Sequence, residues 1–309
     1  MGMTKRQAAN ITVFTVFVSL LLLDILFYTG IFDGLDSRGR DISFTLLSQI
    51  LCMGVMPYFI YKKLTGEQKL FGSFMYNKMG LDDFNKSVMV SFSFVFLNIY
   101  IAAFSIMGLE ALGYTSVSGE ATIMPNLFWL GVQLFTIACL PAIFEEFVFR
   151  GIVFNAYKDK GFLAVVISAV LFSFMHQNIL QMIYTFVGGL VLGTLAYKTR
   201  SILAPMILHF GINAFSVLMS FGIQNPNHPF AVLYRFILLL TTNGLLVLVF
   251  FAALIFMLVY VIITLVNWKN PEYRFDKQRT PLTGYAFLFG SLVIGVLANA
   301  VSFYFGYIR

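Results

Sequence analysis

Long apolar runs separated by short polar segments dominate this chain. A helix needs about 20 apolar residues to cross the roughly 30 Å hydrocarbon layer of a membrane, and in lipid a helix satisfies its own backbone hydrogen bonds. Nine windows fit this description: 11–32, 42–61, 87–109, 123–144, 161–175, 179–197, 202–223, 236–268 and 282–308. The fifth window is short and the eighth is overlong. The pattern therefore predicts an all-α fold, a polytopic transmembrane helix bundle of about eight or nine spans.

The basic residues lie in the segments between these windows. In membrane proteins, Lys and Arg accumulate in the cytoplasmic loops. Here they gather near the N-terminus and then in alternate loops: Lys5, Arg6, Lys62, Lys63, Lys69, Lys78, Lys86, Lys158, Lys160, Lys198, Arg200, Lys269, Arg274, Lys277 and Arg279. The intervening loops are poorer in them, with Arg38, Arg40 and Arg235 as exceptions. This alternation predicts an integral protein of the cell membrane with a cytoplasmic N-terminus and, if nine spans are present, an external C-terminus.

Composition supports the same class of protein. Of the 309 residues, 59% are hydrophobic and 11% are charged, whereas a soluble domain carries about a quarter charged residues. The net charge of +6 would also suit a nucleic-acid partner, but the basic residues follow the loop pattern of a membrane protein. We therefore expect the lipid bilayer as a partner and no nucleic acid.

The chain shows no long linker and no repeat of fixed period, so one integrated membrane domain is the simplest expectation. Within it we distinguish N-terminal transmembrane helices in 1–122, a catalytic core in 123–223 and C-terminal transmembrane helices in 224–309. Gly189 and Gly193 form a small-xxx-small pattern in the sixth window. Such a pattern lets two helix backbones approach closely, so we expect a packing role for these glycines.

Two adjacent carboxylates and an arginine interrupt the apolar segment 141–151. Each ionisable side chain inside a membrane costs at least about 2.5 kcal/mol on insertion scales, so Glu145, Glu146 and Arg150 call for an explanation. Glu146 and Arg150 are four positions apart and share a helix face, which predicts an ion pair. Glu145 is turned about 100° away and keeps no intrahelical counter-charge, which leaves it as the candidate general base. The alternative is that all three lie at the headgroup boundary and end the helix.

Two further polar elements follow at helical spacing. Phe172 and His176 share one face, so the two rings can pack together, although a lone histidine at a helix end is more often structural. His209 and Asn213 are also four positions apart and project together from one face inside an apolar run, where they need an internal partner. The remaining histidine lies in a proline-flanked turn and receives no assignment.

The order of these elements, E-E-x-x-x-R, F-x-x-x-H and H-x-x-x-N in 141–215, resembles the CAAX-protease and bacteriocin-processing family, often called Abi proteins. The resemblance covers about a quarter of the chain. It implies an intramembrane endopeptidase in which Glu145 activates the attacking water with the help of His176. It further implies that His209 and Asn213 stabilise the oxyanion, while Glu146, Arg150 and Phe172 support the site.

The resemblance leaves the substrate and the cofactor open. Family members act on prenylated CAAX proteins or on leader-type peptides, so we expect a peptide or protein substrate at the membrane. They are commonly labelled metalloproteases, and Glu145, His176 and His209 are the ligand types of a zinc site. The chain lacks the H-E-x-x-H spacing that would enforce that geometry, and the same residues also serve a metal-free glutamate mechanism. Both versions remain open at this point.

Two other functions compete with a peptidase. Intramembrane Glu, His and Arg also form ion pathways in transporters, but those usually show matched halves with broken helices, which this chain does not. A bacteriocin-immunity protein that binds a peptide without cutting it is the other alternative. Such a protein would tolerate loss of Glu145, whereas a peptidase would not.

Overall fold

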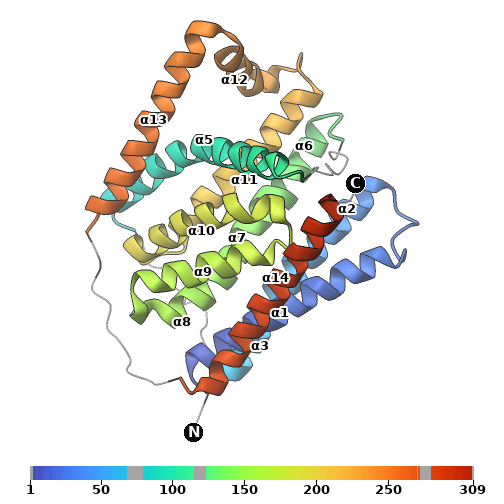
Figure 1. Ribbon diagram of the computed structural model, residues 1–309, viewed down its shortest axis with the longest axis vertical. Helices are drawn as coiled ribbons and strands as arrows, with labels where there is room; N and C mark the ends of the chain where they lie inside the picture. Colours follow the sequence, from blue (N-terminus) through green and yellow to red (C-terminus); the bar gives the residue numbers. More distant parts are fainter. Residues whose placement is uncertain (1–2, 68–78, 115–122, 270, 272–279, 308–309) are drawn as a thin grey trace.

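The computed structural model describes residues 3–67, 79–114, 123–269, 271 and 280–307. These residues form helices and no strand (Figure 1), and eight of the helices are long and apolar enough to cross a membrane. The predicted all-α bundle of about eight or nine spans is confirmed, and the chain is an integral membrane protein. Among the basic loop residues of the topology prediction, Lys69, Lys78, Arg274, Lys277 and Arg279 lie outside the described residues.

The described residues form the following helices in chain order. They are α1 (Lys5–Tyr28), α2 (Ser37–Leu46), η1 (Leu47–Val55), α3 (Met56–Thr65), α5 (Leu81–Ala111), α6 (Leu127–Gln133), η2 (Leu134–Cys139), α7 (Leu140–Glu146), η3 (Phe147–Phe154), α8 (Asn155–Tyr157), η4 (Lys158–Lys160), α9 (Phe162–Met175), α10 (Ile179–Thr199), α11 (Leu203–Gln224), η5 (Pro229–Ala231), α12 (Val232–Thr242), α13 (Gly244–Asn267), η6 (Leu282–Tyr285) and α14 (Ala286–Tyr307). Several of these join end to end, so Ser37–Thr65 and Leu127–Lys160 are each one long helix.

Both long helices contain π-helical turns. In Ser37–Thr65 the π-helical part is η1, and in Leu127–Lys160 η2 and η3 lie on either side of α7. Because π-helical turns inside α-helices are rare and frequent at functional sites, they draw attention to α7 and to the facing part of η1. The glutamate pair ends α7 directly before η3.

The short window 161–175 and the overlong window 236–268 do not each form one complete spanning helix in the structure. α9 has only 14 residues, about 21 Å at a rise of about 1.5 Å per residue, which is short for a complete crossing. The overlong window 236–268 is divided between α12 and α13 by Asn243. The Asn243 side chain accepts a hydrogen bond from the amide of Leu246, so it begins α13 as an N-cap.

The small-residue pattern on α10 packs against α9, as predicted. A Cβ atom on Gly189 would lie 3.1 Å from the Cα and Cβ of Ala169, and one on Gly193 would lie 2.9 Å from Cγ1 of Val165. The absence of these two side chains therefore allows the α9 and α10 backbones to approach closely. Phe172, which the sequence predicts to support the site, lies on α9 about one turn after Ala169.

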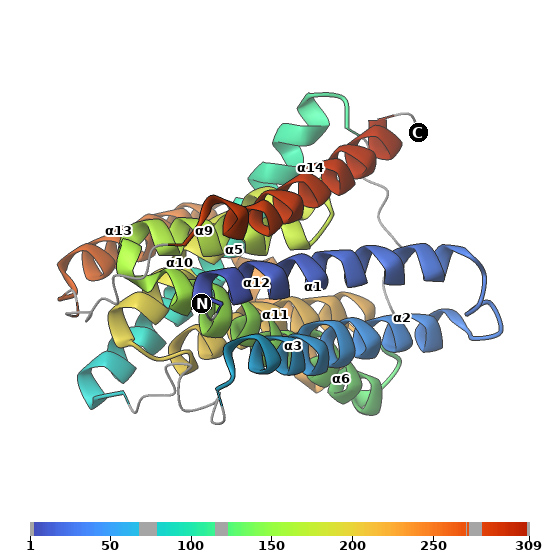
Figure 2. The same cartoon turned by 90° about the horizontal axis from the view of Figure 1, so that it is seen from below.

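α14 closes the bundle along the N-terminal helix. α1 and α14 run side by side in both views (Figures 1 and 2), with the aromatic ring of Phe14 against Phe287. Gly290 faces the Phe14 ring so closely that an added Cβ would lie 2.6 Å from Cε2. The C-terminal helix is thus packed on the helices that surround the polar residues.

Candidate active site

One cavity of about 380 Å³ gathers the polar residues that the sequence predicts as catalytic. Its lining includes Glu145 from α7, His176 at the end of α9, and His209 and Asn213 from α11. Phe172 also lines this cavity, whereas Glu146 and Arg150 lie behind it. Four residues from three separate segments of the chain therefore share one hollow in the bundle.

Glu145 presents one free carboxylate oxygen. Its side chain is only 5% exposed, and Oε1 accepts a hydrogen bond of 2.8 Å from Nε2 of Gln49 on η1. Among the described residues, Oε2 has no hydrogen-bond partner. It lies 3.8 Å from Nε2 of His209, which is too long for a direct hydrogen bond. A buried polar atom without a partner is costly, so it calls for a functional explanation.

Glu146 and Arg150 form the ion pair predicted from their spacing. Both are fully buried, and Nη1 of Arg150 donates to Oε1 of Glu146 at 2.8 Å. Nη2 of Arg150 donates to the main-chain oxygen of Gly189 at 3.0 Å, and the guanidinium lies over the ring of Phe172 at 4.7 Å. Both side chains are therefore inside the bundle, and the helix continues beyond them to Lys160, so they do not end it.

Glu146 also holds a histidine of the cavity. Nδ1 of His209 lies 2.8 Å from Oε1 of Glu146, so this ring nitrogen donates and the other, Nε2, faces Glu145. Oε2 of Glu146 has no partner among the described residues, but it does not face the cavity. The two adjacent glutamates therefore differ in environment: Glu146 is bound by Arg150 and His209, and Glu145 is bound by the neutral amide of Gln49.

His176 is fixed through its own helix. Nδ1 lies 2.8 Å from the main-chain oxygen of Phe172, which makes Nδ1 the protonated nitrogen and leaves Nε2 available. The ring packs edge-on against Phe172 with 4.9 Å between centroids, and His209 packs against the same ring at 5.7 Å. The predicted contact of Phe172 with His176 is confirmed, and Phe172 also orients the second imidazole.

Both histidines contact the same Phe172 ring, so they lie near each other although one follows α9 and the other lies within α11. Helix rise alone would place His176 and His209 at different distances from the ends of their helices. Rise measures position along a helix axis, however, and differently tilted helices can bring such positions together.

Asn213 lies one turn beyond His209 on the same face of α11. Its Nδ2 donates to the main-chain oxygen of Ile137 on η2 at 3.0 Å. This bond fixes the amide while a second N–H and the oxygen remain. The internal partner expected for this face of α11 is therefore the helix Leu127–Lys160, which supplies Glu146 to His209 and Ile137 to Asn213.

Gln49 is a site residue that the sequence reading missed. It lies in the window 42–61, which carries no charge, and only its amide distinguishes it from its apolar neighbours. A lone amide in a membrane helix usually seeks a partner on another helix, and this was the available signal. Which partner it finds depends on the packing of η1 against α7.

The ligand types of a zinc site are present, but their positions do not fit one ion. Among the described residues, no three His, Cys, Asp or Glu side chains are close enough together to hold a metal. Nδ1 of each histidine is engaged by an oxygen acceptor, and Oε1 of Glu145 is engaged by Gln49. Zinc bonds of about 2.0–2.2 Å would require the remaining atoms to move closer, so we derive no step through a metal.

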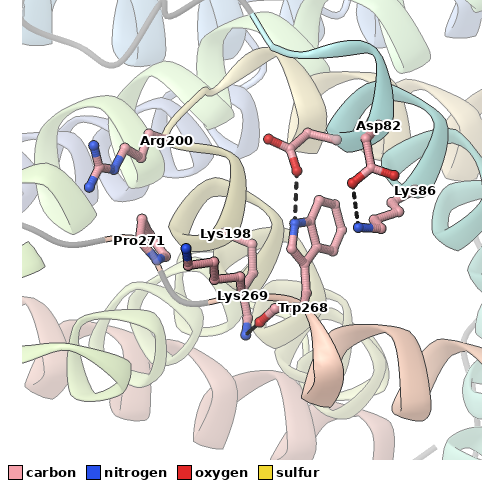
Figure 3. Close-up of a pocket in the computed structure, with 8 residues that line it drawn as sticks. Asp82, Lys86, Lys198, Arg200, Trp268, Lys269 and Pro271 are labelled. Carbon is pink, nitrogen blue, oxygen red and sulfur yellow. Dashed lines mark hydrogen bonds and ion pairs between the residues drawn. The ribbon is translucent and has the colours of Figure 1, made fainter.

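A second cavity, of about 430 Å³, lies where the start of α5 meets the ends of α10 and α13 (Figure 3). Here the indole of Trp268 donates to Asp83, Lys86 pairs with Asp82, and Lys198 donates to the main-chain oxygen of Trp268. These bonds tie the ends of three helices together. The cavity shares no lining residue with the candidate active site.

Comparison with known proteins points to the same part of the chain. Residues 127–215 match the family of the type II CAAX prenyl endopeptidase Rce1-like proteins. The chain is also 33% identical over 79 residues to the "Putative membrane peptidase YdiL" of Bacillus subtilis (strain 168). That similarity spans 25% of this chain and 32% of the relative, so only about a third of the relative's length is covered. No solved structure matches the chain. The matched residues 127–215 hold every residue of the candidate active site named above except Gln49, so this part of the membrane protein is similar to the CAAX prenyl endopeptidase family.

Proposed function

We propose that this chain is an intramembrane endopeptidase that hydrolyses a peptide bond of a membrane-associated or leader-type peptide, with 123–223 as its catalytic core. The observation that carries this proposal is the shared cavity of Glu145, His176, His209 and Asn213. Peptide hydrolysis needs a base for water and donors for the oxyanion, and this cavity offers a carboxylate, two imidazoles and an amide.

Glu145 is the residue we assign to activate water. Its Oε2 accepts no hydrogen bond from the described residues and would take one proton from the water, whose oxygen then attacks the peptide carbonyl carbon. The same proton passes to the leaving amine nitrogen when the carbon–nitrogen bond breaks, so Glu145 returns to its starting form. His176, through Nε2, is placed to hold the water or to assist this transfer.

His209 and Asn213 are the groups we assign to the oxyanion. They follow one another on one face of α11, and each is anchored through one nitrogen, to Glu146 and to Ile137 respectively. In a site shielded from water, a pre-positioned donor can lower the barrier by about 3 kcal/mol. Donation by Nε2 of His209 requires that both ring nitrogens carry protons, because Nδ1 already donates to Glu146.

We propose the substrate class from the names of the matching family and relative. The family description names a prenyl endopeptidase, and the Bacillus relative is named as a membrane peptidase without a substrate. A prenylated CAAX protein and an unlipidated leader peptide are therefore the two substrates to compare. Each would reach the cavity from the membrane or from its surface.

We also infer a cytoplasmic N-terminus in the cell membrane. Arg6 pairs with Asp159, and Lys5 pairs with Glu67, so the start of α1, the end of the long helix Leu127–Lys160 and the segment after α3 meet at one end of the bundle. This end carries the basic residues of three predicted cytoplasmic loops. Labelling of single cysteines from either side of the membrane would test this orientation.

The decisive experiment compares the wild-type protein with Glu145→Gln in the producing cells. Quantitative proteomics of membrane peptides should find one or more cleavage products with the wild type and none with the variant. An immunity or transport protein predicts unchanged peptides, and an immunity protein would also keep its phenotype in the variant. Identical peptide profiles, with equal protein levels, would refute the peptidase proposal.

A further inference from the structure

Gln49 on η1 is a hydrogen-bond partner of Glu145, the proposed base. Its side chain is buried, and Nε2 donates to Oε1 of Glu145 at 2.8 Å across 96 positions of the chain. Its own Oε1 is buried without a partner among the described residues. η1, which carries Gln49, lies outside the segment 127–215 that matches the family.

The fold brings Gln49 to Glu145 through a tight helix contact. Gly54, also on η1, faces the ring of Phe144, the residue before Glu145, and an added Cβ would lie 2.7 Å from Cε1 of that ring. This contact holds η1 against α7. Because η1 is π-helical, its residues are spaced differently from those of an α-helix, which sets the direction in which Gln49 points.

From this geometry we propose that Gln49 is a positioning residue that engages Oε1 of Glu145 and thereby directs Oε2 to the attacking water. The inference rests on the proposed function. A neutral amide suits this task better than a cation. An amide can donate to a carboxylate through its nitrogen and, after turning over, accept from a carboxylic acid through its oxygen, whereas a cation can only donate. Glu145 can therefore gain and return a proton without losing its partner.

Three variants test the role of Gln49. Gln49→Leu removes the hydrogen bond while keeping a side chain of similar volume. Gln49→Glu replaces the amide by a carboxyl group in the same position beside Glu145. The matched control is Gln133→Leu, which removes a buried amide from α6 that does not line the cavity. The substrate is a quenched-fluorescence peptide built on the cleavage site that the proteomic comparison identifies.

We expect Gln49→Leu to lower kcat by about ten- to a hundredfold with little change in KM, because a hydrogen bond to a charged group is lost. Gln49→Glu should be active at low pH, where the introduced acid is protonated and donates, and should lose activity as pH rises and the two carboxylates repel. Gln133→Leu should keep the wild-type rate and pH profile. Equal rates and pH profiles in all four proteins would overturn the inference while leaving the peptidase proposal intact.

A second measurement needs no substrate. Dicyclohexylcarbodiimide modifies protonated carboxyl groups in apolar surroundings, and mass spectrometry can follow its reaction with Glu145 as pH is varied. Loss of the donor in Gln49→Leu should extend the labelling of Glu145 to higher pH, and Gln133→Leu should not. Unchanged labelling would reject the contact. A shifted labelling curve in a protein that cleaves no peptide would instead uphold the contact and reject the proposed function.

Discussion

Nδ1 of His209 lies 2.8 Å from Oε1 of Glu146, although the two residues are 63 positions apart in the chain. The same oxygen accepts from Nη1 of Arg150 at 2.8 Å. Glu146 therefore joins α7, η3 and α11 at one buried point, and its neighbour Glu145 is left to face the cavity. This division of two adjacent carboxylates gives the first prediction.

Glu145→Gln and Glu146→Gln should differ in stability. Glu146→Gln leaves the fully buried Arg150 without its counter-charge, which typically costs about 3–5 kcal/mol. Glu145→Gln removes a charge that has no cationic partner within hydrogen-bond distance among the described residues, so its unfolding temperature should match the wild type. Thermal unfolding of both variants in the same detergent checks this, alongside the loss of cleavage expected for Glu145→Gln. Equal destabilisation of the two variants would contradict the division of roles.

Arg150→Lys should be intermediate between the wild type and Arg150→Ala. A lysine keeps the charge but cannot bind Glu146 and the Gly189 oxygen at once with the planar fork of an arginine. Its stacking over Phe172 would also be lost. The measurement is the unfolding temperature, with Arg40→Lys as the exposed control. A lysine variant as stable as the wild type would show that the bond to Gly189 is dispensable.

Gly189→Ala should separate α9 from α10. The new methyl group would lie 3.1 Å from the backbone and side chain of Ala169, and overpacking of this kind usually costs about 1–3 kcal/mol. The displacement would move Phe172, so activity should fall together with stability. Gly108→Ala on α5 is the control, because among the described residues no atom outside its own helix backbone and its two chain neighbours lies within 4 Å of its added Cβ. If both alanine variants unfold at the wild-type temperature, the close approach of α9 and α10 is not required.

Asn213→Ala should lower kcat and leave the fold intact. If its amide stabilises the oxyanion, the loss should be about a hundred- to a thousandfold in kcat with a smaller change in KM. Asn213 is only partly buried and bonds to a single main-chain oxygen, so little stability should be lost. Ser220→Ala, on the same helix but outside the cavity lining, provides the control. A variant with wild-type kcat would remove Asn213 from the mechanism.

Chelation should leave activity unchanged. Glu145, His176 and His209 are the proposed zinc ligands, but as placed they do not form a set of three donors for one ion. We therefore expect activity to survive 1,10-phenanthroline and metal analysis of the pure protein to find less than one equivalent. One equivalent of zinc that is absent from Glu145→Gln, with chelator-sensitive cleavage, would establish the metal-dependent version instead.

Local sequence was sufficient for the helices and for the contacts within one helix. Apolar length predicts spans because each span must bury its backbone polar groups in its own hydrogen bonds. Spacing of four residues places Glu146 beside Arg150 and Phe172 beside His176, since helix geometry alone brings such pairs together. Those parts of the fold and of the candidate site could be read from the sequence.

Contacts between helices depend on packing, which the sequence pattern does not specify. The bond of His209 to Glu146 and the bond of Gln49 to Glu145 join segments whose relative tilt and rotation are set by many side-chain contacts at once. The expected range of eight or nine spans has a related cause. α9 has 14 residues, too few for apolar length alone to define a span, and its place in the bundle depends on its packing against α10. The sequence by itself determined an all-α membrane protein and its polar motifs, because these follow from local periodicity. Only the tertiary structure decided that these motifs share one cavity and that Gln49 joins them, because side chains on separate helices meet only where the helices pack.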